Sequence, residues 1–213
     1  MASISDFYPY VMPAVQGCPT GIVNMAIKNA IVDFCDKTLM WRYTFAPMDI
    51  VDGQSSYEFT SPDDAAISKP LYVSVNGNQL YGTNEDDLDI LYSGWREATS
   101  NSPVMYYMDY NSNLILVPTP SENQDGSLIL QVALRPSFDA VEFEDWLLED
   151  WGEVIGHGAL MRLHAMPGKV WADTNTVQYH RAKFREGVSR AKSRTMKSFG
   201  RQTKSVQPRQ FWE

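Results

Sequence analysis

The pattern of apolar and polar positions predicts helices toward both ends of the chain and a middle section of short β-strands. After Pro19, apolar residues recur at helical spacing from Ile22 to Phe34, with polar residues between them. Proline suits a first helical turn, because its ring fixes φ and no backbone N–H is needed there. We therefore expect a helix that begins near Thr20 and ends within Thr38–Trp41, where the sequence becomes β-prone.

Between Tyr43 and Ser137, short apolar stretches alternate with turn signals, as in antiparallel sheets. Asn76–Gly77–Asn78 predicts a hairpin, because Asn and Gly accept positive φ, and Asn111–Ser112 predicts a second one. A short helix is expected from Asn84 to Trp95, with acidic residues at its positive end. The predicted strands are Ser56–Thr60, Leu71–Val75, Gln79–Tyr81, Val104–Tyr110, Asn113–Pro118 and Leu128–Leu134.

Helical periodicity returns after Ser137. One helix is predicted over Glu142–Met166, and a last one begins at Asp173 or Thr174 with a narrow apolar stripe. Gly152 and Gly156 lie four residues apart in the first of these. Because glycine costs about 1 kcal/mol per helical position relative to alanine, the pair indicates close approach of another helix.

These elements predict an α+β fold. We expect an antiparallel helical bundle, made of the N-terminal helix and two C-terminal helices, that carries an inserted antiparallel β-rich region and an extended C-terminal arm. The corresponding division is 1–42 for the N-terminal segment and helix, 43–137 for the β-rich insertion, 138–198 for the C-terminal helices and 199–213 for a flexible basic docking arm.

The distribution of charge adds more to this prediction than the overall composition does. The formal net charge of −8 is the sum of an acidic region and a basic region. Residues 1–150 carry −16 and residues 151–213 carry +8. This asymmetry indicates nucleic-acid contact or a match between acidic and basic surfaces of neighbouring subunits. No apolar run reaches the roughly 20 residues of a membrane span, and no secretory signal is recognised. Cys18 and Cys35 are therefore expected to be reduced, with Cys35 in the core.

Candidate catalytic chemistry is sparse. Glu153, His157 and His164 share a helix face, which allows a metal site, but a local Glu153–His157 pair is the simpler interpretation. The acidic run Glu85–Asp89 lacks the glycine and terminal glutamate of a calcium loop. No enzymatic activity, catalytic residue, metal or cofactor is expected.

The basic C-terminal segment is the strongest candidate for a binding site. Ten Lys and Arg residues between Thr174 and Arg209 accompany a single acidic residue, Glu186, and the chain then reaches Phe211 and Trp212. A solvated helix face explains the first arginines but not the terminal aromatics, which indicate burial against a partner. Docking on a protein is favoured because no aromatics interleave with the charges; a nucleic-acid-binding module using the basic C-terminal helix is the alternative.

The opening SDFYPYVMPAVQGCPTGIVNMAIKNAIVDFCDKTLMWRY resembles the head-to-tail adaptor (connector or neck) proteins of tailed phages, of the short-tailed podovirus type. LRPS at 134–137 and MPGKVWAD at 166–173, before an Arg-rich helix, are also similar. The positions that carry the first similarity are Tyr8, Pro9, Val11, Pro13, Cys18, Pro19, Ala26, Ile27, Ala30, Phe34, Cys35, Trp41 and Arg42.

The resemblance implies a structural virion protein at the capsid–tail junction, assembled in the host cytoplasm and not bound to membranes. Copies would form a ring, a dodecamer in such families, between the portal protein and a tail or nozzle protein. Viral DNA would pass through the channel without sequence-specific binding. By analogy with the family, the portal-binding residues would be Arg190, Arg194, Lys197, Arg201, Lys204, Arg209, Phe211 and Trp212.

An acidic channel wall would favour passage of the genome, because carboxylates do not adhere to phosphates. Asp63, Asp64 and the run Glu85–Asp89 are the candidates for this lining.

Overall fold

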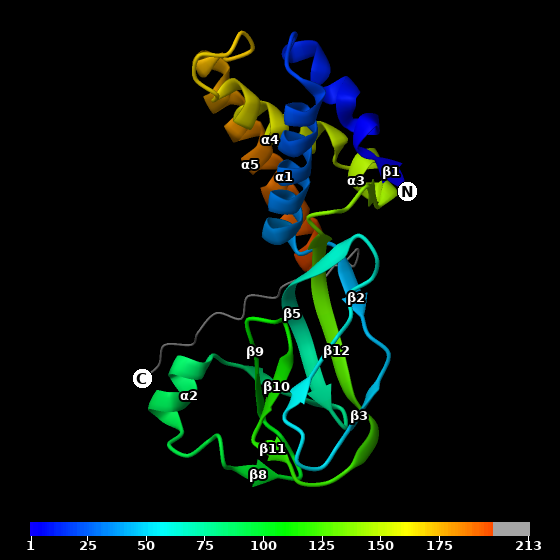
Figure 1. Cartoon of the computed structure of the whole chain (residues 1–213), viewed down its shortest axis with the longest axis vertical. Coiled ribbons are helices and arrows are strands. Elements are labelled where there is room, and N and C mark those ends of the chain that lie inside the picture. The colour runs from blue at the N-terminus through cyan, green and yellow to red at the C-terminus, as the bar shows by residue number, and fades with distance from the viewer. Residues whose placement is uncertain (198–213) are drawn as a thin grey trace, which may run out of the picture.

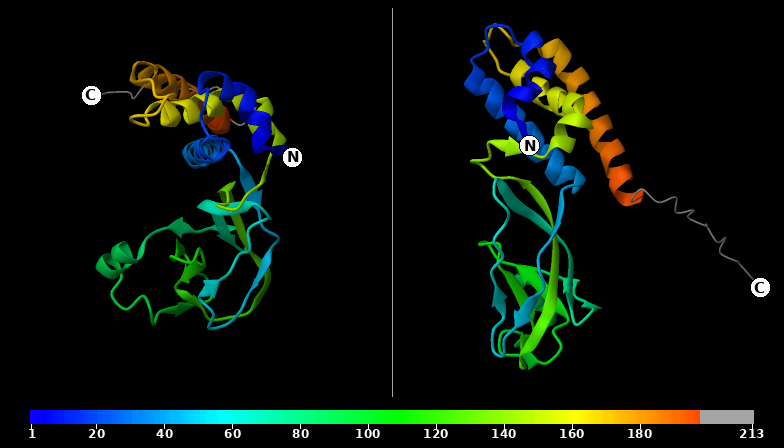
Figure 2. Two further views of the ribbon diagram at one scale, coloured as in Figure 1. Left: turned by 45° about the horizontal axis from the view of Figure 1, so that its top comes forward. Right: turned by 90° about the vertical axis from the view of Figure 1, so that its right-hand side faces the viewer.

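The computed structural model describes residues 1–197 of the chain. The molecule is elongated, with most helices gathered at one end and most strands at the other (Figure 1). Two turned views show the same separation, with helix α5 along the outer edge of the helical end (Figure 2). The chain leaves the helical end after α1, builds the β end, and returns through β12.

Helix α1 (Thr20–Thr38) has the predicted position, and it ends where Leu39 takes a left-handed conformation with φ of 53°. Helix α2 begins after Asn84 as expected, but it stops at Leu91 and does not reach Trp95. The helices are the 3-10 helices η1 (Ile4–Tyr10) and η2 (Met12–Ala14), and α1 (Thr20–Thr38), α2 (Glu85–Leu91), α3 (Asp145–Glu149), α4 (Gly152–His164) and α5 (Thr174–Lys197).

The strands form several sheets. One sheet has the order β2-β12-β5-β6, with β3 also on β12, and a second has the order β4-β10-β9-β7, while β1 pairs with β13 and β11 with β8. The strands are β1 (Ala2–Ser3), β2 (Arg42–Thr44), β3 (Met48–Ile50), β4 (Ser56–Tyr57), β5 (Ala65–Val75), β6 (Asn78–Gln79), β7 (Tyr81–Gly82), β8 (Thr99–Ser100), β9 (Met105–Met108), β10 (Leu114–Val117), β11 (Thr119–Pro120), β12 (Gln124–Pro136) and β13 (Glu142–Phe143).

Both predicted hairpins are present. At the first, Ser74 pairs with Gln79, and the turn residues Asn76 and Gly77 have φ of 51° and 79°. The second turn is longer than the two residues expected, since Met108 is the last residue to pair, with Leu114. The Asp109 carboxylate closes this turn by accepting the backbone N–H groups of Asn111 and Asn113, both at 2.8 Å.

The predicted fold class is wrong. The protein is β-rich with several sheets, and is not a helical bundle that carries a small insertion. The β part is also not purely antiparallel, because β7 runs parallel to β9 and β11 runs parallel to β8. Turn signals and alternation reveal individual strands, but these pairings join segments distant in sequence, so local patterns do not encode them.

The single helix predicted over Glu142–Met166 is also wrong. Its first residues form β13, which pairs with β1 at the N-terminal end of the chain. The remainder is divided into α3 and α4 at Trp151, whose φ of −131° is not helical. The 3-10 helix η1, which the sequence pattern did not indicate, lies against α4.

The glycine groove on α4 is confirmed, and Tyr10 of η1 occupies it. A Cβ atom at Gly152 would lie 2.8 Å from Tyr10 Cε2, and one at Gly156 would lie 2.7 Å from Tyr10 Cβ. Only glycine permits this contact without displacement of η1.

Separate hydrophobic cores stabilise the two ends. The helical core includes Phe34, Ile155 and Phe184, and the main β core includes Leu116 and Leu130. Trp41 packs against both. The junction is also polar, because Asp36 of α1 accepts hydrogen bonds from Arg135 at 3.1 Å and Ser68 at 2.6 Å. These contacts join the helical end to the β end.

Candidate functional site

Helix α5 carries the candidate binding surface and is held by a narrow apolar stripe. The stripe is the predicted one, with Val177, Phe184, Val188 and Ala191 all buried. At its start, the Asp173 carboxylate accepts the backbone N–H of Asn175 at 3.0 Å. Since the stripe covers one face only, the basic residues fall on the two flanks beside it.

The flank of α5 that faces α3 and α4 is tied to its own fold. The Arg190 guanidinium lies 5.3 Å from the Trp151 ring, and Arg194 donates to the Asp150 carboxylate at 2.7 Å. Gly187 lets α4 approach on this side, because a Cβ there would lie 2.4 Å from a Val154 methyl. Two of the predicted partner-binding arginines therefore anchor α5.

The opposite flank presents Arg181, Arg185 and Lys192. Their spacing of four and then seven residues places them within a narrow sector of the helix, and all three are exposed. No carboxylate of residues 1–197 lies within ion-pair distance of any of them, in contrast to Arg194. Met196, whose side chain is 84% exposed, continues the same sector. We call Arg181, Arg185, Lys192 and Met196 the basic flank.

The remaining predicted partner-binding residues are placed only in part. Lys197 is the last residue of α5. Arg201, Lys204, Arg209, Phe211 and Trp212 lie outside the described residues, as does the segment 199–213 predicted to be a docking arm.

A histidine cluster lies between α4 and α5. The Nδ1 atoms of His157 and His180 are 2.9 Å apart, and the His164 ring stacks on His180 with centroids 5.4 Å apart. Burial lowers the pKa of His157, with Lys183 adding to this effect and Glu153 opposing it. Burial also lowers the pKa of His180, helped by the two neighbouring histidines and opposed by Asp173.

Sequence reasoning placed His157 and His164 together but missed His180. The signal was available, since Pro167–Gly168 reverses the chain and brings the next helix back along α4. Glu153 remains a weak local partner, with its carboxylate 3.8 Å from His157 Nε2 and its side chain 81% exposed. Within the described residues, no set of three or more His, Cys, Asp and Glu side chains has an arrangement able to hold a metal ion.

The acidic run of α2 is a capped helix start. Asn84 accepts the Asp87 backbone N–H at 2.7 Å, and Asp89 accepts from Trp95 Nε1 at 2.8 Å and from Arg96. The hydrogen bond from Arg96, and then that from Trp95, lower the pKa of the Asp89 carboxyl. Acidic side chains of this run therefore accept hydrogen bonds from other groups of the same chain.

The structure does not bring all the candidate channel acids together. Asp64 lies at the junction of the two ends, where its carboxylate accepts the Val141 backbone N–H at 3.2 Å. Helix α2 instead projects from the side of the β end (Figure 1). Cys35 is fully buried in the helical core as predicted, and burial raises the pKa of its thiol.

A hollow on the surface lies beside α1, on the side away from α5. It is a groove of about 620 Å³ between α1 and the segment that follows β12. Met25 and Phe138 line it, and their side chains are 66% and 90% exposed. Lys28 and Arg135 also line it, and Lys28 donates to the Phe138 carbonyl at 2.8 Å.

The basic flank and this groove are exposed surfaces on two sides of the helical end. The sequence model of the SU10 adaptor protein family matches residues 14–207, which is most of the chain. The protein belongs to the SU10 adaptor protein family. It is accordingly a structural adaptor protein of a phage. None of the helices in residues 1–197 combines the length and hydropathy that a membrane span requires.

One curated protein is also similar over part of its length. Cell surface glycoprotein MUC18 of Mus musculus is 24% identical to this chain over 162 residues. The match covers 76% of this chain but only about a quarter of the mouse protein. This identity is too low to indicate membership of a family.

Proposed function

We propose that this adaptor forms a ring of the podovirus head-to-tail type, which joins the portal to the tail or nozzle and surrounds the path of the DNA. The observation that carries the proposal is the family match over residues 14–207, which includes α5 and most of the basic segment that follows it. The opposite charges of the two regions also support a role in assembly, because complementary surfaces guide association.

Portal docking is assigned to the chain after α5. Arg190 and Arg194 hold α5 against Trp151 and Asp150, so this helix gives the following residues a fixed starting point. Arg201, Lys204 and Arg209 would pair with acidic groups of the portal, while Phe211 and Trp212 would bury their rings. Large aromatics and arginines contribute most of the affinity in many protein interfaces.

Acidic residues at two heights along the molecule are assigned to the channel wall. Asp63 and Asp64 would line one level at the junction, and Glu85–Asp89 on α2 would line another. Negative charge at both heights would repel the DNA phosphates and so prevent the genome from binding to the channel wall. A ring structure in which both sets face away from the lumen would contradict this assignment.

Truncation tests the docking assignment. A chain that lacks residues 197–213 should fold normally, because the helical core lies within the remaining residues. Its affinity for the purified portal should fall at least about 100-fold, the size expected when several aromatic and arginine anchors are lost together. Affinity is measured by biolayer interferometry with immobilised portal.

The double variant Phe211→Ala, Trp212→Ala separates the aromatics from the charges and should lose much of the same affinity. Its matched control is Tyr81→Ala, Tyr110→Ala, which removes two aromatics that are 76% and 103% exposed on the β end. The control should bind the portal normally. Unchanged binding by the truncated chain would refute the docking role.

A further inference from the structure

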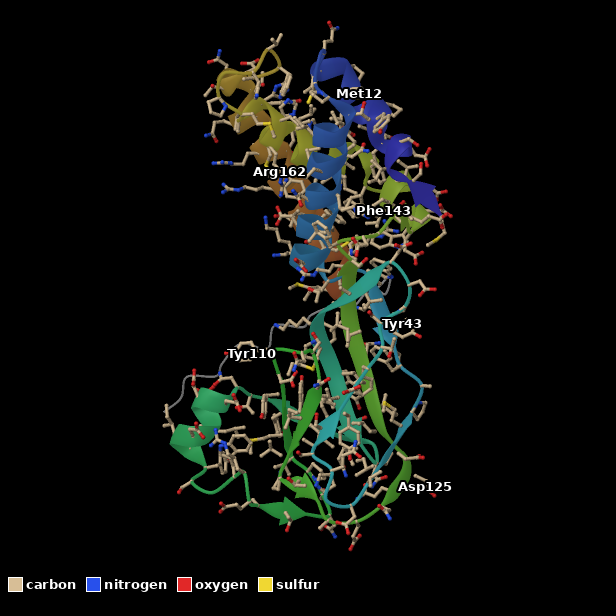
Figure 3. The ribbon with its side chains drawn as sticks, viewed as in Figure 1. Met12, Tyr43, Tyr110, Asp125, Phe143 and Arg162 are labelled. Carbon is tan, nitrogen blue, oxygen red and sulfur yellow. The ribbon has the colours of Figure 1, made fainter. Side chains whose placement is uncertain are left out.

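Two exposed surfaces of the helical end have opposite charge, and only some of their charged groups, such as Asp150 and Arg194, are paired within the chain. Residues 138–150 contain six acidic residues and no lysine or arginine, whereas α5 contains seven lysines and arginines and one acid. In the stick view, Arg162 and Phe143 are labelled on either side of α1, toward α5 and toward β13 respectively (Figure 3). The acidic surface is on the β13 side.

The acidic surface is built around apolar side chains. Phe138 and Val141 are 90% and 67% exposed, and Met25 adds a third apolar group across the groove from Phe138. Asp139 and Glu142 are exposed beside them. Of the two cations that line the groove, Arg135 is paired with Asp36 and Lys28 donates to the Phe138 carbonyl, so the exposed unpaired side-chain charges at its edge are carboxylates. We call Met25, Phe138, Asp139, Val141 and Glu142 the acidic groove. An apolar centre with charges at its edge is the usual anatomy of a protein–protein interface.

Helix α1 separates the acidic groove from α5. Successive residues of a helix are about 100° apart, so Met25 and Lys28 of the groove lie on one face of α1. Asp33 and Lys37 lie farther round α1, where Asp33 bonds to Arg162 of α4 and Lys37 lies 5.5 Å from the Phe184 ring of α5. One copy can therefore use both surfaces at once without self-contact.

We infer that the acidic groove of one copy docks on the basic flank of a second copy, so that copies associate head to tail. This inference rests on the proposed ring and names the surfaces that would build it. Contacts between two different patches produce a ring when the rotation closes. Phe138 and Val141 would contact Met196 and the α5 surface around it, and Asp139 and Glu142 would face Arg185 and Lys192.

A second copy fits both surfaces better than the other candidates do. Nucleic acid would suit the basic flank, but its phosphates would be repelled by the acidic groove and would leave Phe138 exposed. An acidic patch on another protein would likewise cover only one of the two surfaces. The second copy satisfies the charges and covers the apolar centre in the same contact.

Charge reversal in the full chain tests the pairing. The first variant is Arg185→Glu, Lys192→Glu, which makes both surfaces acidic, and the second is Asp139→Lys, Glu142→Lys, which makes both basic. Each alone should raise the dissociation constant for self-association at least about 100-fold, because like charges would then face each other. Their equimolar mixture should assemble again as alternating copies.

Sedimentation velocity over a range of protein concentrations, at low and high salt, is the measurement. The wild-type association should weaken as salt rises. The matched control is Glu97→Lys, Asp125→Lys, which reverses two exposed acids of the β end and should behave as wild type. Circular dichroism checks that each variant is folded. Phe138→Ala changes a side chain that is 90% exposed, so that a loss of self-association in this variant reflects the interface and not the fold.

Several results would overturn the inference. One is assembly of either reversed variant alone at wild-type strength, and another is a mixture that remains monomeric. A DNA mobility shift that is lost in Arg185→Glu, Lys192→Glu, without any self-association of the wild type, would assign the basic flank to phosphate binding. If any of these results is obtained and the wild type still binds the purified portal, the assignment of the two surfaces is wrong but the proposed adaptor function stands. If the wild type does not bind the purified portal, the proposed function itself is contradicted.

Discussion

The helical end and the β end use the same residue, glycine, for different purposes. In the helical end, Gly158 and Gly187 lie where another element touches, and a Cβ atom at either would collide with Phe184 or Val154. In the β end, Gly77 lies in a turn with φ of 79° and would meet nothing within 4 Å. At these positions, glycine permits close contact between distant segments in the helical end and a left-handed backbone conformation at a turn in the β end.

The ion pairs differ in the same way. Arg162–Asp33, Arg135–Asp36 and Arg194–Asp150 each join two different elements of the helical end or its junction. In the β end, Arg96–Asp89 closes a loop of seven residues. Partners of the first kind are determined by the tertiary fold, and those of the second kind by the local chain.

The largest expected effect is at a contact between helices. Gly187→Ala places a methyl group against Val154, whose methyls would lie 2.4 and 2.5 Å away. The free energy of unfolding should fall by about 1–3 kcal/mol, the usual cost of overpacking, despite the better helix propensity of alanine. Urea unfolding followed by circular dichroism measures the change.

A double variant and a control show whether contact is the cause. Gly187→Ala with Val154→Ala should lose less stability than the sum of the single changes, because the smaller side chain makes room. Gly21→Ala in α1 has nothing within 4 Å and should be neutral or slightly stabilising. Equal losses at Gly187 and Gly21 would show that packing is not responsible.

A turn substitution in the β end should have a smaller effect. Gly77→Ala keeps the available space but forces alanine into φ of 79°, so the free energy of unfolding should fall by about 1 kcal/mol. Gly77→Asn should retain more stability than Gly77→Ala, because asparagine tolerates this conformation. Equal stability of the alanine variant and the wild type, by urea unfolding, would contradict the role given to the turn.

The smallest expected effect is a pH dependence confined to the helical end. The pKa values of His157 and His180 are lowered in the folded state, so the unfolded chain binds more protons at mildly acidic pH. Stability contributed by the neutral rings is therefore present above the unfolded pKa of about 6.5 and is lost as pH falls below it. Thermal unfolding between about pH 7.5 and 5.5 measures this loss.

The cluster also has a geometric reason to resist protonation. Two protonated rings would place donors against each other across the 2.9 Å Nδ1–Nδ1 contact. His180→Asn should flatten the pH dependence, and Glu153→Gln should change it little because that side chain is largely exposed. A profile with the same slope in His180→Asn would exclude the cluster as its source.

The sequence predicted elements well where local chemistry determines them. Helix α1 follows from its periodicity, and the β5–β6 hairpin follows from Asn76–Gly77. The fold class was wrong because sheet partners such as β7 and β9 are chosen by contacts between distant segments. Strand β13 escaped prediction for the same reason, since it pairs with a strand near the start of the chain.

In the candidate site, too, the local features were predicted and the contacts between distant segments were not. Its basic character and the buried stripe of α5 were predicted from residue types and spacing. The partners of Arg190 and Arg194 were not, because Trp151 and Asp150 approach them only in the folded helical end. His180 could have been found by treating the last two helices as an antiparallel pair.

The β5–β12 pair gives the adaptor a mechanical property. Strand β12 has 13 residues and extends from the junction to the far end of the molecule, a length of about 43 Å at about 3.3 Å per residue. Its hydrogen bonds to β5 run across the strands. Tension applied between the two ends of the molecule therefore shears many of these bonds at once and does not open them singly, so that the β end resists stretching along its length.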